Sequence, residues 1–170
     1  MDELRLGLRG VVRRVWAPRG VKIVQPLELR YQWQYLVLAV DGLGGKLSWL
    51  WTANMKSESL VPVIESWRTT GVPGVVCDGA ASHRSQRVRD VGLPLIVQPV
   101  AAPELNPAER LFEEIRRYVE GRVYATLADK VARVECYLTD LAAAPERLRS
   151  LAGWGWIQLA LQPTENTMAS

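Results

Sequence analysis

Long apolar runs and paired cysteines are both missing from this sequence. No stretch approaches the roughly 20 apolar residues that a membrane-spanning helix needs, and the first residues are charged where a signal peptide carries an apolar core. The two cysteines, Cys77 and Cys136, lie far apart in apolar stretches, so neither a disulfide framework nor a CxxC metal site is indicated. We therefore expect a protein without a membrane anchor, located in the reducing cytoplasm.

Internal repeats, low-complexity linkers and clustered turn residues are also missing. The 13 glycines and 10 prolines are scattered along the 170 residues rather than gathered at a boundary. With 48% hydrophobic and 23% charged residues, the chain is expected to form a single globular domain. We place this domain at residues 1–161 and predict a disordered tail at residues 162–170, which have almost nothing to pack.

The excess of positive charge is small. A net charge of +3 and a pI near 9.1 are compatible with a polyanionic partner, but mildly basic proteins without such a partner are common. The first two dozen residues hold a cluster of basic side chains, which either contact phosphates or form a solvated basic face. The candidate phosphate contacts are Arg5, Arg13, Arg14, Arg19, Lys22 and Arg84.

Four β-rich or apolar runs occur in the first hundred residues. Residues 32–40 and 46–52 are joined by a glycine-rich stretch, so they predict an antiparallel hairpin in which Asp41 serves the turn. Residues 74–77 and 94–97 are short and wholly apolar, which predicts strands buried on both faces. A hairpin followed by alternating strands and helices indicates the α/β class, with a mixed β-sheet flanked by helices.

Helices are predicted after the hairpin and throughout the C-terminal third. The first is expected to begin at a cap on Ser57 or Ser59, to carry Pro62 in its first turn and to stop at Gly71. Its expected apolar face consists of Leu60, Val61, Ile64 and Trp67.

Three further helices are predicted near the C-terminus. Asn106 caps the first of them, which carries a proline at its first position and ends near Gly121. Thr126 together with Asp129 opens the second, and residues 145–152 form a short third helix. The apolar face of the first consists of Ala108, Leu111, Phe112, Ile115 and Val119.

A few polar residues occupy positions where chemistry is possible. Asp78 follows a predicted buried strand at the edge where open α/β sheets gather ligands, so it either binds a cation or caps the next turn. Glu109 is either functional or part of a capping box. His83, the only histidine, either supports a carboxylate or phosphate or is an ordinary surface residue. Asp2 and Glu3, taken alone, indicate no more than solvated charge.

Three blocks of sequence belong together as a set of motifs. They are DELRLGL at 2–8 with VWAPRG at 15–20, VVCDGAASH at 75–83, and PELNPAERLF at 103–112. They resemble the first catalytic Asp with its Trp-x-Pro-x-Gly stretch, the Asp-Asn-x-x-x-His strand end and the Pro-x-Leu-Asn-Pro-x-Glu motif of one family. That family is the DDE transposases of the mariner superfamily, and the resemblance is closest to its bacterial insertion-sequence branch.

The resemblance implies a ribonuclease-H-like fold in which Asp2, Asp78 and Glu109 are the catalytic acids and hold two Mg²⁺ or Mn²⁺ ions. It implies cleavage of double-stranded DNA at transposon ends and transfer of the freed strand into target DNA. An oligomer of the chain assembled on DNA is expected to carry this out. The residues at His83 and Asn106 are expected to support the acids.

The chain departs from the family's pattern in several places. Gly79 replaces the usual Asn, and Phe112 replaces the usual Trp. Almost nothing precedes Asp2, and the family's N-terminal helix-turn-helix region is missing, so we expect a fragment, the second frame of a split gene or a decayed copy, with that region encoded separately. Two other functions stay open: an inactive remnant that binds DNA or a partner protein, and a stand-alone ribonuclease-H-like nuclease.

Overall fold

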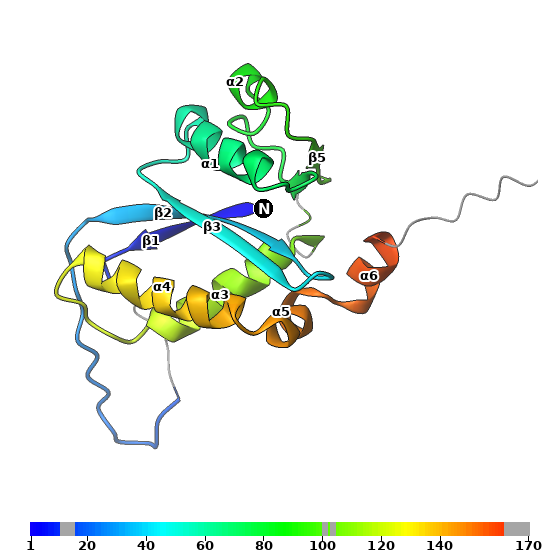
Figure 1. The fold of residues 1–170 in the computed structure, drawn as a ribbon. Coiled ribbons are helices and arrows are strands. Elements are labelled where there is room, and N and C mark those ends of the chain that lie inside the picture. The colour runs from blue at the N-terminus through cyan, green and yellow to red at the C-terminus, as the bar shows by residue number, and fades with distance from the viewer. Residues whose placement is uncertain (11–15, 100–101, 103–104, 162–170) are drawn as a thin grey trace, which may run out of the picture.

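The computed structural model describes residues 1–10, 16–99, 102 and 105–161 (Figure 1). A three-stranded antiparallel sheet in the order β1-β2-β3 lies at its centre, with strands β1 (Asp2–Gly7), β2 (Trp33–Asp41) and β3 (Lys46–Thr52). Asp41 accepts hydrogen bonds through Oδ1 from the backbone of Leu43 at 3.0 Å and of Gly44 at 2.7 Å. The predicted hairpin is confirmed, and so is the role of Asp41 in its turn.

Two further strands, β4 (Val75–Cys77) and β5 (Leu95–Val97), pair in parallel across a connection that contains α2 (Gln86–Arg89). In Figure 1 they lie with α1 (Ser57–Thr69) and α2 on one side of the three-stranded sheet, and the later helices cover its other side. The Met1 amino group donates to the carbonyl of Val76, which joins the start of β1 to β4. The predicted α/β class is confirmed, with the parallel and antiparallel strands in two separate ladders.

The prediction that β4 and β5 are buried on both faces is wrong. Val75 and Cys77 are buried, but Val76, Ile96 and Val97 are exposed. Only one face of this small sheet joins the core formed with α1 and α2. A wholly apolar run contains no polar position to mark its outer face, so sequence alone cannot distinguish one covered face from two.

The start of α1 also differs from the prediction. The helix begins at Ser57 itself, after Lys56, whose side chain forms no cap. Asn54 organises this end instead, because its Oδ1 accepts from the backbone of Lys56 at 2.9 Å and from the Ser59 hydroxyl at 3.0 Å. Pro62 therefore lies inside the helix, beyond the first turn, where it removes one backbone hydrogen bond.

The rest of α1 follows the sequence pattern more closely. Leu60, Ile64 and Trp67 are buried as expected, while Val63 joins them and Val61 is only partly buried. The predicted stop at Gly71 is confirmed by its φ of 82°, in the left-handed region that favours glycine.

The C-terminal helices are α3 (Pro107–Val119), α4 (Leu127–Ala142), α5 (Pro145–Ala152) and α6 (Gly155–Leu161). The first three were predicted, the first two of them with their caps, and Thr126 forms a complete capping box with Asp129. The last was not predicted from the sequence. None of the described helices is both long and apolar enough to cross a membrane. The predicted tail at 162–170 lies outside the described residues.

The three-stranded sheet separates two hydrophobic cores. Leu4, Leu6, Leu36 and Leu38 pack with α3, α4 and α5, and the buried residues of the opposite core include Met1 with side chains of α1 and β4. Successive side chains of a strand point to opposite faces, so Asp2 shares the face of Leu4 and Glu3 shares the face of Met1. The two adjacent acids therefore point toward different layers of the fold.

Candidate catalytic acids around the start of strand β1

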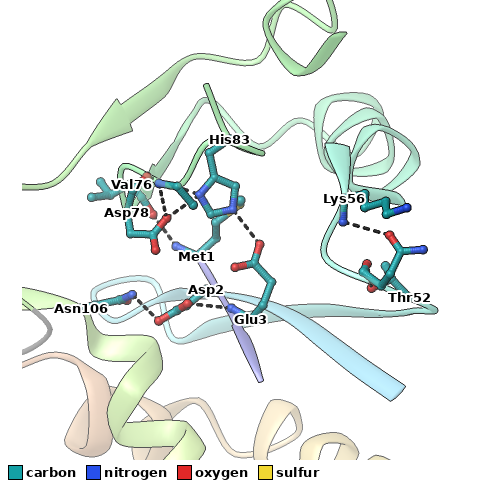
Figure 2. A network of polar contacts seen from close by, with 11 residues as sticks. Met1, Asp2, Glu3, Thr52, Lys56, Val76, Asp78, His83 and Asn106 are labelled. Carbon is teal, nitrogen blue, oxygen red and sulfur yellow. Dashed lines mark hydrogen bonds and ion pairs between the residues drawn. The ribbon is translucent and has the colours of Figure 1, made fainter. Parts of the chain in front are cut away.

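Asp2, the first residue of β1, is tied to the helix that carries Glu109. Its Oδ1 accepts from the backbone N–H of Glu3 at 2.7 Å, and its Oδ2 accepts from Nδ2 of Asn106 at 2.9 Å (Figure 2). Asn106 is buried and accepts through its own Oδ1 from the backbone of Ala108 at 3.1 Å, which caps α3. One amide side chain thus holds the first candidate acid and fixes the helix start beside the third.

The carboxyl of Asp2 is partly buried and is repelled by other acidic side chains. Burial raises the pKa of Asp2 to about 6, although the hydrogen bond from the Glu3 backbone opposes this rise. The carboxylates of Glu3, Glu109 and Asp78 add to it by repulsion. Repulsion from both other candidate acids, Asp78 after β4 and Glu109 on α3, thus contributes to the raised pKa of Asp2.

Asp78 directly follows β4, and its side chain is 55% exposed. Its Oδ1 accepts from the backbone of Ala80 at 3.0 Å and also faces Nδ1 of His83 at 2.7 Å. Asp78 therefore organises the following turn, which is one of the two roles that the sequence predicts for it. Its side chain nevertheless reaches solvent, where a carboxylate can bind a cation.

His83 is not a surface residue, because only 2% of it is exposed. Its ring lies between two carboxylates, with Nδ1 facing Asp78 and Nε2 at 2.7 Å from Oε1 of Glu3 (Figure 2). Burial alone would lower the pKa of His83, but hydrogen bonding to Cys77 and Glu3 raises it to about 11. The histidine thus acts as a buried cationic link between β1 and the end of β4.

Glu3 is the residue that the sequence did not single out. Its side chain is 3% exposed, so the expectation that it is solvated charge at a free end is wrong. The available signal was its place next to Asp2 in a strand, which sends its side chain to the opposite face. Nothing in the sequence indicates that His83 lies on that face of the strand.

Glu109 lies in the first turn of α3 and lines an open pocket with Asn106, Arg110, Glu113, Leu151 and Trp154. Its carboxylate forms no hydrogen bond or ion pair with any residue that the structure describes, and the side chain of Asn106 accepts from the backbone of Ala108 rather than from that of Glu109. The reciprocal capping box is therefore not formed. The carboxylate is left facing a solvent-filled space.

The donor chemistry of these residues fits a hard divalent cation. Asp2, Asp78 and Glu109 offer carboxylate oxygens, which Mg²⁺ and Mn²⁺ prefer, and their mutual repulsion is what a bound cation would relieve. Within the described part of the chain, no three acidic, histidine or cysteine side chains lie close enough together to hold a metal ion by themselves. Mg²⁺ commonly takes only one or two carboxylates and completes its shell with water and substrate phosphates.

The sequence pattern that defines the DDE superfamily endonucleases matches residues 1–130, a span that includes all three acids. The chain belongs to this family. Structures of Mos1 transposase have the same fold: a paired-end complex with the left transposon end superposes with a TM-score of 0.64 at 13% identity, over 89% of this chain and 50% of that one. A Mos1 strand transfer complex gives a TM-score of 0.62 at 14% identity, over 89% of this chain and 52% of that one.

A third Mos1 structure, a mariner paired-end complex with Mn, gives a TM-score of 0.60 at 13% identity and covers 89% of this chain and 52% of that one. The chain therefore spans about half the length of these transposases. No curated protein matches it. The ribonuclease-H-like fold expected from the sequence is confirmed, and the family to which the chain belongs is one of endonucleases.

The basic residues of this DDE domain are only partly described. Arg5, Arg19, Lys22 and Arg84 are exposed, as phosphate contacts need to be. Arg5 already lies over the Trp33 ring, with its guanidinium carbon 3.7 Å from the ring centroid. Arg13 and Arg14 lie outside the described residues. Contact of these side chains with phosphate remains a prediction.

The raised pKa of Asp2 predicts a pH-dependent stability. Between the unfolded value of 3.8 and the folded value of about 6, the folded chain binds a proton that the unfolded chain releases, so stability falls as the pH rises through this window. Relative to Asp2→Asn, the wild type should gain about 1–2 kcal/mol in its free energy of unfolding from pH 7.5 to pH 4.5. Urea denaturation at both pH values measures this, and an unchanged difference would contradict the assigned environment.

Proposed function

We propose that this DDE domain is the catalytic domain of a transposase of the mariner superfamily, of the bacterial insertion-sequence type. In this proposal it cleaves DNA at transposon ends and joins the freed 3′ ends to target DNA, with Asp2, Asp78 and Glu109 as its acids. The observation that carries it is the set of hydrogen bonds that ties the start of β1 to both other acids, through Asn106 to the helix of Glu109 and through His83 to Asp78, in a fold shared with Mos1 transposase.

Each acid has a distinct support in the chain. Asn106 holds Asp2, His83 holds Asp78, and the first turn of α3 presents Glu109. Asp2, Asp78 and Glu109 would together hold two Mg²⁺ or Mn²⁺ ions, which would supply an activated oxygen nucleophile and neutralise charge on the phosphate. In cleavage, water would attack phosphorus and the bond from phosphorus to the 3′ oxygen would break, which leaves a 5′-phosphate and a free 3′-OH. In strand transfer, that 3′-OH would attack a phosphodiester of the target, and the 3′ oxygen of the target strand would leave as a new 3′-OH.

The partners in this proposal are duplex DNA and further copies of the chain. The exposed side chains of Arg5, Arg19, Lys22 and Arg84 would contact phosphates, which fixes position on a duplex without reading its sequence. Recognition of the transposon ends would then come from a helix-turn-helix region outside these 170 residues. Strand transfer would be carried out by an oligomer assembled on the DNA.

The test is nicking of supercoiled plasmid by the 170-residue chain with Mg²⁺ or Mn²⁺. The wild type is expected to nick the plasmid, EDTA to stop the reaction, and an RNA:DNA hybrid to remain intact. Glu109→Gln should lower the rate at least about 100-fold, because losing a ligand should exceed the 10–100-fold loss typical of a residue that supports one. The matched control is Glu114→Gln on the same helix, because Glu114 pairs with Arg117 at 2.7 Å and is not one of the residues that line the pocket of Glu109.

A second candidate function is a DNA-binding module without catalysis. The absence of a three-residue metal cluster among the described residues favours it. A module of this kind would bind duplex DNA equally well with and without EDTA, and no metal would produce nicks. Cleavage of the hybrid but not of the plasmid would instead indicate a ribonuclease-H-like nuclease.

A further inference from the structure

Glu3 has the burial and partners of a residue with a defined task. Its side chain is 3% exposed, and its Oε1 lies 2.7 Å from Nε2 of His83. Burying a carboxylate costs free energy unless it is paired with an opposite charge, so the Glu3 side chain needs a partner in this position. The opposite nitrogen of the same ring lies 2.7 Å from Oδ1 of Asp78.

The hydrogen bonds of the ring have a fixed direction. An ionised carboxylate has no hydrogen to donate, so the ring nitrogen that faces each one must carry the N–H. Glu3 and Asp78 therefore accept from opposite ends of one rigid, planar group. Rotating the ring to suit one of them would break its bond to the other.

The two residues joined in this way come from different ladders of the fold. Glu3 lies in β1 of the three-stranded sheet, while Asp78 follows β4 of the parallel pair. Among the described residues, the side chain of Asp78 is otherwise held only by the local turn, through the backbone of Ala80 at 3.0 Å. His83 thus fixes the exposed side chain of Asp78 relative to β1. Without this contact the side chain could adopt several rotamers.

We propose that Glu3 is a positioning residue, which acts through His83 to hold the carboxylate of Asp78 in the orientation that binds a divalent cation. This inference rests on the proposed function, because it takes Asp78 as a metal ligand. In this role Glu3 would contact neither metal nor DNA, and its effect on metal binding would come through the direction in which Asp78 points.

Isothermal titration of Mn²⁺ into the full chain tests this proposal. Glu3→Gln and Glu3→Ala should weaken Mn²⁺ binding about 10–100-fold, the range for residues that orient a ligand. His83→Gln should weaken it by a similar factor, and the double variant with Glu3→Gln should be no worse than either single one, because both act through one link. Additive losses would show that Glu3 acts independently of His83 and would overturn the proposal.

The matched control is Glu135→Gln. Glu135 is another partly buried carboxylate, which accepts from the indole of Trp49 at 3.0 Å and also from that of Trp51, between α4 and β3. Its loss should lower the melting temperature and leave Mn²⁺ affinity unchanged. If Glu135→Gln weakened Mn²⁺ binding as much as Glu3→Gln does, general loosening of the fold would explain both, and the proposal would fail.

A second readout does not depend on metal affinity. Because His83 is the only histidine, its ring gives an isolated pair of N–H signals in ¹⁵N NMR. In Glu3→Gln, the Nδ1–H signal that faces Asp78 should shift together with the Nε2–H signal, and a shift confined to Nε2–H would overturn the proposal. If the wild type bound no Mn²⁺ at all, the proposed function would fail; normal wild-type binding with unaltered Glu3 variants would defeat this inference alone.

Discussion

Replacing Asp78 with alanine is expected to lower metal-dependent DNA nicking more than about 100-fold while the chain stays folded. Losing a residue that merely orients a metal ligand typically costs 10–100-fold, so losing the ligand itself should exceed this range. The fold should survive because the side chain is 55% exposed and the backbone carbonyl of Asp78 remains 3.3 Å from Nδ1 of His83. Rates from plasmid nicking and melting curves of the same samples measure the two effects.

Two further variants separate charge from shape at this position. Asp78→Asn keeps an oxygen that can accept from Ala80 and His83 but removes the negative charge, so it should be nearly as inactive as Asp78→Ala. Asp90→Ala is the matched control, since Asp90 is an exposed aspartate at the end of α2 whose carboxylate accepts from Gln86 at 2.7 Å. Full nicking by either Asp78 variant would exclude Asp78 from the catalytic acids.

The parts of the fold that sequence predicted well are determined by residues close together in the chain. The cap at Asn106, the capping box at Thr126 and Asp129, and the turn at Asp41 each depend on contacts within a few positions. The start of α1 is the exception. There Asn54 outcompetes two serines because its Oδ1 reaches two donors at once.

The residues of the candidate site also differ in whether their contacts are local in the sequence. Asp78 and Glu109 could be proposed from local pattern, because one ends an apolar strand and the other opens a capped helix. Asp2 was proposed only through resemblance, since its bond to Asn106 spans 104 positions. The burial of Glu3 and His83 depends on a contact across 80 positions, so no window of the sequence contains it.

Replacing His83 with alanine is expected to cause the largest loss of stability among the residues of this site, about 3–5 kcal/mol. The substitution leaves the Glu3 carboxylate almost fully buried with its cationic partner removed. A loss of this size is a large fraction of the stability of a typical domain, so the melting temperature should fall sharply. Urea denaturation gives the free energy, and a loss below about 1 kcal/mol would mean that water or another group solvates Glu3.

A compensating pair can distinguish stability from positioning. Glu3→Met combined with His83→Leu replaces the buried ion pair with apolar groups of similar size, an exchange that is often neutral or stabilising. The double variant should therefore recover most of the stability that His83→Ala loses. It should nevertheless nick plasmid as slowly as His83→Ala does, because no side chain then orients the Asp78 carboxylate. Recovery of nicking together with stability would mean that the buried pair only holds the two ladders together, and that Asp78 finds its orientation unaided.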